Sequence, residues 1–258
     1  MRWARFRSND GRTGFGVFEG EHIIEYDGDM FGAPRATGRT LAEGSFALAS
    51  PCSPSKIVAL WNNFAALGIK LGKAPPSHPL FLIKPSTSVI GPNEPIRRPT
   101  GYPGKIAYEG ELGIVIGKPC RDIAREAARD YIFGYTCVND VTAAEVLNEN
   151  ADFAQWCRSK GYDTFGCLGP VIATGLDWSR VSVVTRVDGI ERQNYPLSDM
   201  IIPPEELVSR ISHDMSLLPG DVIACGTSVG VGSFKDGSRV EVQIDGIGSL
   251  MNALSSGA

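Results

Sequence analysis

Alternating apolar and polar residues dominate the first fifty positions of the chain. In GFGVFEGEHIIEYDGDMFG (residues 14–32), the pairs Glu19-Gly20 and Asp27-Gly28 separate short apolar runs. Such runs bounded by glycine turns are typical of β-hairpins. A Pro/Ser-rich stretch, SPCSPSK (50–56), precedes the next apolar run. We therefore predict a small N-terminal β subdomain at residues 1–52 and a main domain at residues 53–258.

The rest of the chain mixes strand and helix patterns. LFLIKP (80–85) and YEGELGIVIG (108–117) are predicted strands, and Asp188-Gly189 and Asp245-Gly246 mark later hairpin turns. Helical spacing predicts helices within 64–73, 122–131, 151–160 and 203–215. Segment 64–79 is either a mobile lid or a plain connecting helix and loop. Because helices and strands do not alternate regularly, the pattern predicts an α+β fold rather than a doubly wound α/β fold.

Composition and charge exclude several classes of function. The 258 residues are 43% hydrophobic and 21% charged, as in ordinary globular proteins, and the net charge is −4. This charge does not favour nucleic acid or an anionic membrane surface as a partner. The sparse lysines 56, 70 and 73 are interpreted as a solvated face. Without a signal-peptide core or an apolar run of about 18 residues, we expect a cytoplasmic protein.

Cysteine and histidine are poorly placed for a soft-metal site. The six cysteines form no C-x-x-C pair, so we expect reduced, mostly buried thiols. The three histidines (His22, His78 and His213) are well separated. A metal site in this chain would therefore be built from oxygen ligands, which favour a hard cation.

Three acidic residues are candidates for such a site. Glu109 and Glu111 share one face of their predicted strand, because side chains at i and i+2 point the same way. A solvated strand edge would also explain this pair alone. Asp140, however, follows the apolar run 135–138, where an unpaired carboxylate is costly to bury. Three carboxylates completed by water suit Mg²⁺ or Mn²⁺.

Several separated motifs resemble the fumarylacetoacetate hydrolase superfamily. In chain order they are FLIKPSTSVIGP, YEGELGIVIGK, GYTCVNDVTA, QWCRSKGYDTFGCLGP and LLPGDVIACGTSVGVG, within residues 56–252. The resemblance is strongest to the branch of 2-hydroxyhepta-2,4-diene-1,7-dioate isomerases and acylpyruvases. It implies a mixed β-sheet roll that forms a homodimer.

The resemblance also implies roles for individual residues. Glu109, Glu111 and Asp140 match the metal ligands, and Lys160 matches a lysine that points into the site and stabilises developing negative charge. Gln155 matches a polar residue that reaches the substrate. The predicted substrate-binding residues are Thr227 and Gly226, in the Gly-rich loop, and Lys84, which is equally consistent with a structural role.

One departure from the family pattern concerns water activation. Hydrolytic and decarboxylating members carry a histidine and a glutamate on the lid helix, in a block like N-Y-A-x-H-x-x-E. The stretch beginning at Asn63 instead has Leu67 and Lys70 at these two positions. Neither His78 nor Glu94 stands at a matching position, although the loop after the lid could bring His78 close.

Without this pair, the sequence favours a reaction that moves protons rather than adds water. We expect an isomerase or tautomerase acting on a 2-hydroxydienoate or a 2-oxo dicarboxylate; aromatic-acid breakdown supplies such compounds, and enol oxaloacetate is another. Hydrolysis of a C–C bond in an acylpyruvate or fumarylacetoacetate-type substrate is the alternative. Two further alternatives are a catalytically silent binder of metal and 2-oxo acids, and a partner-binding module with coincidental carboxylates. From sequence, we expect Glu109→Ala or Asp140→Ala to abolish turnover with little loss of fold.

Overall fold

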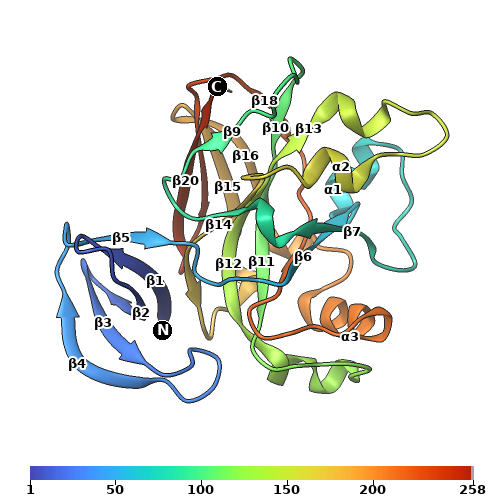
Figure 1. Cartoon of the computed structure of the whole chain (residues 1–258). Coiled ribbons are helices and arrows are strands. Elements are labelled where there is room, and N and C mark those ends of the chain that lie inside the picture. Colours follow the sequence, from blue (N-terminus) through green and yellow to red (C-terminus); the bar gives the residue numbers. More distant parts are fainter. Residues whose placement is uncertain (257–258) are drawn as a thin grey trace.

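The computed structural model describes residues 1–256, and its central feature is a large mixed sheet (Figure 1). Its strands are β1 (Arg2–Ser8), β2 (Thr13–Glu19), β3 (His22–Asp27), β4 (Arg35–Leu41), β5 (Phe46–Ala49), β6 (Lys56–Trp61), β7 (Leu80–Pro85), β8 (Val89–Ile90), β11 (Gly110–Ile116), β12 (Ile132–Asp140), β14 (Gly166–Ala173) and β17 (Val222–Ala224). They follow the order β4-β3-β2-β1-β14-β12-β11-β17-β6-β7, while β5 pairs with β1 and β8 with β14. Most neighbours are antiparallel, but β17 runs parallel to β6 and β8 parallel to β14.

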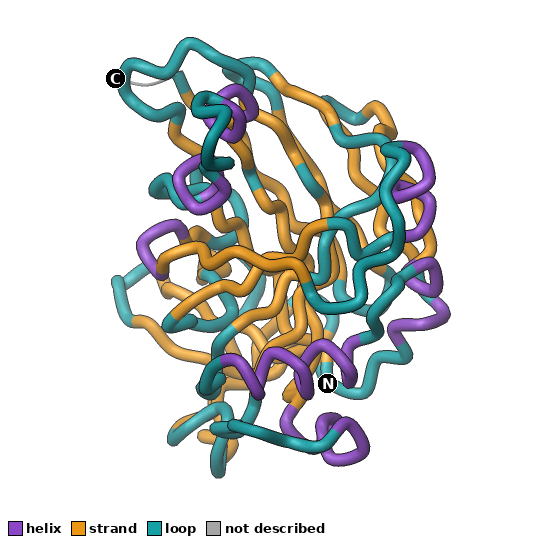
Figure 2. Tube along the Cα trace, turned by 90° about the vertical axis from the view of Figure 1, so that its right-hand side faces the viewer, coloured by secondary structure: helices purple, strands orange, loops and turns teal. Residues whose placement is uncertain are grey.

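Two smaller sheets and several short helices complete the fold. The second sheet has the order β16-β15-β19-β20-β9 and contains β9 (Ile96–Arg97), β15 (Ser182–Val187), β16 (Ile190–Pro196), β19 (Arg239–Ile244) and β20 (Gly248–Ser255). The third joins β13 (Thr142–Ala143), β10 (Ile106–Tyr108) and β18 (Gly232–Phe234). The α-helices are α1 (Ala65–Lys70), α2 (Trp156–Lys160) and α3 (Pro204–Asp214), and the 3₁₀ helices are η1 (Ser86–Ser88), η2 (Arg125–Tyr131), η3 (Ala144–Asn148), η4 (Trp178–Arg180) and η5 (Leu197–Asp199). Figure 2 shows the helices at the periphery of the strands. This mixture of sheets and few helices confirms the α+β prediction.

Most predicted elements are present, but two predicted helices are shorter than expected, and one of them is a 3₁₀ helix. Segment 122–131 forms only the 3₁₀ helix η2. Asp122 has a φ of +52°, and the Ile123 carbonyl accepts from Ser209 Oγ at 2.8 Å, so the Ala127 N–H donates to the Ala124 carbonyl instead. In segment 151–160 only α2 is helical, because the Gln155 N–H donates back to the Leu147 carbonyl. Tertiary hydrogen bonds therefore override the helical spacing at both places.

Strand β11 is buried on both faces. Leu112, Ile114 and Ile116 join the larger apolar cluster, which also includes residues of β19 and β20 from the second sheet. Val115, on the other face, belongs to a second cluster with residues of β1, β6 and β7. Glu111 shares the face of Val115 because both residues have odd numbers in the same strand. The glutamate is thus carried into the protein interior.

The N-terminal strands extend the large sheet. β1 pairs antiparallel with β14 through Arg2 opposite Ala173 and Trp3 opposite Ile172. The Trp3 ring packs against Tyr26 at a centroid distance of 5.0 Å. A division of the chain at residue 52 stays a prediction. Among the helices that the structure describes, none combines the length and hydropathy that a membrane crossing requires.

Gly110 fixes the backbone between the two glutamates. Its N–H donates to Gln193 Oε1 at 3.0 Å, and its carbonyl accepts from the Tyr195 hydroxyl at 2.6 Å and from Thr227 Oγ1 at 3.0 Å. A Cβ atom at this position would lie 2.0 Å from Thr185 Oγ1. Only glycine fits this approach between β11 and the second sheet without movement of the Thr185 side chain.

We predict that Gly110→Ala lowers the free energy of unfolding by about 1–3 kcal/mol, because the added methyl overpacks the contact with Thr185. Urea denaturation measures this change. Thr185→Ala in the same background removes the clashing hydroxyl and should recover part of the loss, as a double-mutant cycle would show. An unchanged stability of Gly110→Ala would contradict the proposed contact.

Candidate metal centre

Strand pairing brings the three predicted acidic residues together. Glu111 lies opposite Val138 in the antiparallel pair of β11 and β12, so Asp140 points to the same face. The Asp140 N–H donates to the Glu109 carbonyl at 2.9 Å, which places these two residues side by side. One oxygen from each carboxylate can be chosen so that all three lie within 4.8 Å of one another.

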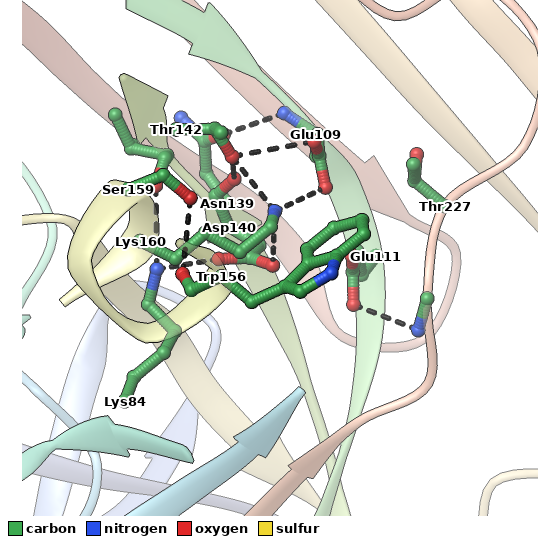
Figure 3. Close-up of polar contacts among 12 residues, drawn as sticks. Lys84, Glu109, Glu111, Asn139, Asp140, Thr142, Trp156, Ser159, Lys160 and Thr227 are labelled. Carbon is green, nitrogen blue, oxygen red and sulfur yellow. Dashed lines mark hydrogen bonds and ion pairs between the residues drawn. The ribbon is translucent and has the colours of Figure 1, made fainter. Parts of the chain in front are cut away.

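Two lysines enter this carboxylate cluster (Figure 3). Lys160, the last residue of α2, donates from Nζ to Glu109 Oε2, Asp140 Oδ2 and Thr142 Oγ1, each at 2.7 Å. Lys84 of β7 donates to the other Asp140 oxygen, Oδ1, and to the Val141 carbonyl. Both lysines are buried, so three carboxylates face two ammonium groups in surroundings that water screens only weakly.

The surroundings shift the pKa values of these groups in different directions. Burial, reinforced by the Asp140 and Glu109 carboxylates, raises the pKa of Glu111 well above its usual range. Burial also raises the pKa of Glu109, although Lys160 opposes the shift. Burial alone would raise the pKa of Asp140, but Lys160 and Lys84 together hold it below its usual value. Asp140 is therefore the best compensated of the three carboxylates, and Glu111 the least.

Glu111 has an unsatisfied oxygen. Its Oε2 accepts the Gly226 N–H at 2.8 Å, whereas its buried Oε1 has no hydrogen-bond partner among residues 1–256. Leaving a buried carboxylate oxygen unpaired is costly. A divalent cation among Glu109, Glu111 and Asp140 would satisfy this oxygen, and three carboxylates are the donor type that Mg²⁺ and Mn²⁺ prefer. The residues present therefore fit a hard divalent cation.

A cavity of about 300 Å³ opens beside the cluster. Its walls come from β6, α1, α2 and the Gly-rich loop after β17, and its lining residues are Leu60, Trp61, Asn62, Leu67, Lys70, Leu71, Glu109, Thr142, Leu147, Trp156, Lys160, Thr227, Gly230 and Val231. Both residues that depart from the family pattern, Leu67 and Lys70, are in this wall. His78 and Glu94 are exposed and do not line the cavity. The loop after α1 thus does not bring His78 to the site.

The other predicted site residues lie in different surroundings. Thr227 lines the cavity, and Gly226 orients Glu111 through its N–H. Lys84 lies behind Asp140 rather than in the cavity wall. Gln155 is also outside the wall, and its side-chain amide donates to the Phe153 carbonyl at 3.0 Å. The structure therefore brings Lys160 and Thr227 to the cavity but not Gln155.

Sequence reasoning missed three polar residues around the cluster. Thr142 accepts from Lys160 and donates to Glu109 Oε1 at 3.3 Å. Asn139 Oδ1 accepts the Glu109 N–H at 3.1 Å, and Gln193 donates to Thr227 Oγ1 at 2.8 Å. Thr142 could have been found from its i+2 spacing to Asp140. No local signal indicated Gln193, which comes from β16 in the second sheet.

Two family profiles match the chain. The profile described as fumarylacetoacetate (FAA) hydrolase C-terminal matches residues 56–255, and the one described as Rv2993c-like, N-terminal matches residues 1–51. Protein Rv2993c of Mycobacterium tuberculosis is 40% identical over 265 residues, which cover 98% of this chain and 97% of that protein. Oxaloacetate tautomerase YisK of Bacillus subtilis is 35% identical over 214 residues, 78% of this chain and 70% of that protein.

Solved structures with the same fold include two isomerases and one hydrolase. A 5-carboxymethyl-2-hydroxymuconate delta-isomerase from Mycobacterium smegmatis has a TM-score of 0.91 and 40% identity, covering 99% of this chain and 100% of the other. A 2-hydroxyhepta-2,4-diene-1,7-dioate isomerase from Mycobacterium marinum has a TM-score of 0.90 and 38% identity, covering 99% and 98%. A maleylpyruvate hydrolase from Sphingobium sp. SYK-6, in complex with manganese(II) and pyruvate, has a TM-score of 0.80 and 27% identity over 100% of both chains.

The contacts of Asp140 change the expectation that its removal would spare the fold. Asp140→Asn leaves Lys84 and Lys160 buried without their shared carboxylate, so we predict a loss of about 3–5 kcal/mol in the free energy of unfolding. Urea denaturation measures it, with the exposed Glu94→Gln as the control. A loss no larger than that of the control would show that the two ion pairs do not hold the site together.

For Glu111→Gln in metal-free protein, we predict a gain in the free energy of unfolding instead of a loss. Because the folded-state pKa of Glu111 is raised, its contribution to stability is full below its unfolded pKa and is lost as pH rises. Glutamine cannot ionise, so in EDTA the variant should exceed wild type by about 1–3 kcal/mol above neutral pH, and the gain should vanish in acid. Added Mg²⁺ should stabilise only wild type. Melting curves across pH measure both effects; equal stabilisation of the variant by Mg²⁺ would contradict the ligand assignment.

Proposed function

Because the chain belongs to the fumarylacetoacetate hydrolase family, we propose that it is a metal-dependent isomerase or tautomerase of an enolisable 2-oxo acid or 2-hydroxydienoate. The composition of the cavity wall is the main observation that supports an isomerase or tautomerase. Leu67 and Lys70 stand where the hydrolytic pattern has histidine and glutamate, and no histidine lines the cavity within residues 1–256. The relatives include two solved isomerases and an oxaloacetate tautomerase, which also supports an isomerase or tautomerase reaction.

Glu109, Glu111 and Asp140 would hold the metal ion. The chemistry that a bound Mg²⁺ or Mn²⁺ supplies is Lewis-acid polarisation of the 2-oxo group. The unsatisfied Glu111 oxygen supports this assignment, as does the manganese(II) complex of the related maleylpyruvate hydrolase. Mg²⁺ is the ion we propose first.

Lys160 and Thr227 would act on the substrate from the cavity wall. The Lys160 ammonium is held by Glu109, Asp140 and Thr142, so it is oriented before a substrate arrives. It would stabilise negative charge that develops on a substrate oxygen. The Thr227 hydroxyl donates to the Gly110 carbonyl at 3.0 Å and accepts from Gln193, which fixes its position at the mouth of the Gly-rich loop.

Two residues assigned to the substrate from sequence would have supporting roles. Lys84 would hold Asp140, and Gly226 would orient Glu111. Gln155 would reach a substrate only if its bond to the Phe153 carbonyl were released. The family resemblance implies a homodimer, which stays a prediction. Measuring the molecular mass of the protein in solution would test it.

Mass-resolved turnover of a small panel of acids tests the proposed reaction. The panel contains 2-hydroxydienoic acids, oxaloacetate and an acylpyruvate, each with Mg²⁺ and with EDTA. We predict a change of absorbance at unchanged mass that EDTA abolishes. Cleavage into two acids would overturn the isomerase assignment in favour of the hydrolase. Metal-dependent binding without turnover would indicate a silent binder of metal and 2-oxo acids. If neither binding nor turnover depended on metal, the chain would be a partner-binding module.

We also predict that Lys160→Met lowers kcat by about 10²–10³-fold, as expected when a preorganised group that stabilises developing charge is removed. Lys73→Met, an exposed lysine outside the cavity wall, is the matched control and should keep wild-type kcat. Steady-state kinetics with saturating Mg²⁺ measure both variants. A rise in KM with unchanged kcat would show that Lys160 binds substrate without stabilising the transition state.

A further inference from the structure

Lys70 places an uncompensated positive charge in the cavity wall. It is the last residue of α1, and it lines the same cavity as Lys160 and Glu109. Lys160 is held by two carboxylates, whereas Lys70 forms no ion pair or side-chain hydrogen bond with any residue from 1 to 256. A cation in a binding cavity without a protein partner is free to bind an anionic ligand.

The cavity wall combines polar and apolar residues. Polar groups of Glu109, Thr142 and Lys160 line it at the cluster. Other walls are apolar and include the Trp61 and Trp156 rings, whose centroids are 5.6 Å apart. Among residues 1–256, Lys70 makes no ion pair with Glu109 or any other carboxylate, so its ammonium group is available to a ligand. At about 300 Å³ the cavity is at the small end of the range for small-molecule sites, which favours a short ligand.

The charge at this position also matters for the reaction. A glutamate there repels a second negative group on the substrate, whereas a lysine attracts it. Lys70 therefore replaces the glutamate of the water-activating pair with a group that can bind an anion in the same cavity wall.

We propose that Lys70 is a specificity-determining residue that binds a second carboxylate of the substrate, distal to the 2-oxo acid group. The ligand would have its 2-oxo acid end at the carboxylate cluster, an apolar middle along the tryptophan rings, and its distal carboxylate at Lys70. This inference rests on the proposed function, because the cluster must hold a divalent ion for the 2-oxo acid end to bind there.

Paired ligands isolate the distal carboxylate. 2-Oxoglutarate and 2-oxopentanoate have the same five-carbon chain and the same 2-oxo acid end, but a terminal carboxylate in the first is a methyl group in the second. 2-Oxoadipate and 2-oxohexanoate form a longer pair. Binding of each acid to the Mg²⁺-loaded protein is measured by isothermal titration calorimetry, which does not depend on turnover.

In at least one pair, we expect wild type to bind the dicarboxylate about tenfold more tightly than its monocarboxylate analogue. This is the low end of the range for a hydrogen bond to a charged group, because Lys70 is exposed to solvent. Lys70→Met should abolish the preference and leave monocarboxylate binding unchanged, and Lys70→Glu should reverse it. Lys73→Met, three residues further along and outside the cavity wall, should behave as wild type. Rising salt should weaken dicarboxylate binding to wild type but not to Lys70→Met.

The outcomes separate the two proposals. Equal binding of both members of each pair to wild type, or an unchanged preference in Lys70→Met, would overturn the role of Lys70 and leave the proposed function standing. An equal loss in Lys73→Met would also overturn it, because general surface charge would then explain the preference. No binding of any of the four acids to Mg²⁺-loaded wild type would overturn this inference together with the proposed binding of 2-oxo acids.

Discussion

Carboxylates buried side by side repel one another unless positive charge lies among them, and in this protein Lys84 and Lys160 supply that charge. Both lysines meet at Asp140, one at each of its oxygens. Asp140 therefore links β7, β12 and α2 at one end of the large sheet. The remaining negative charge falls on Glu109 and Glu111, whose pKa values burial raises. A site that still favours one more positive charge is the physical basis for proposing a divalent ion.

The rest of the fold keeps this cluster in place and gives it access to a cavity. Gly110 allows the close approach of the second sheet to the backbone between the two glutamates, and Gln193 and Tyr195 fix that backbone from β16. On the open side, α1 contributes Leu67 and Lys70 to the wall. The large sheet thus carries the acidic cluster, and α1 adds Leu67 and Lys70 to the wall of the cavity beside it.

Sequence was sufficient for the parts of the site that follow from local periodicity. The E-x-E spacing predicted that Glu109 and Glu111 lie together, and the structure places both beside Asp140. Glu109, however, lies between β10 and β11 and not within a strand. Sequence failed where tertiary hydrogen bonds compete with local pattern, as in segment 151–155, whose backbone donors are used elsewhere. Because this segment is not helical, Gln155 turns to Phe153 instead of the cavity. The pairing of Lys84 with Asp140, 56 residues away in sequence, depends on the order of strands in the sheet and leaves no local signal.

Direct binding of Mn²⁺, followed by electron paramagnetic resonance of the free ion, tests the central claim that Glu109, Glu111 and Asp140 hold a divalent cation. The account predicts one ion bound per chain in wild type and in the exposed-site control Glu94→Gln, and no comparable binding in Glu111→Gln, whose fold does not depend on the missing charge. Absence of binding in wild type, or equally tight binding in Glu111→Gln, would contradict it.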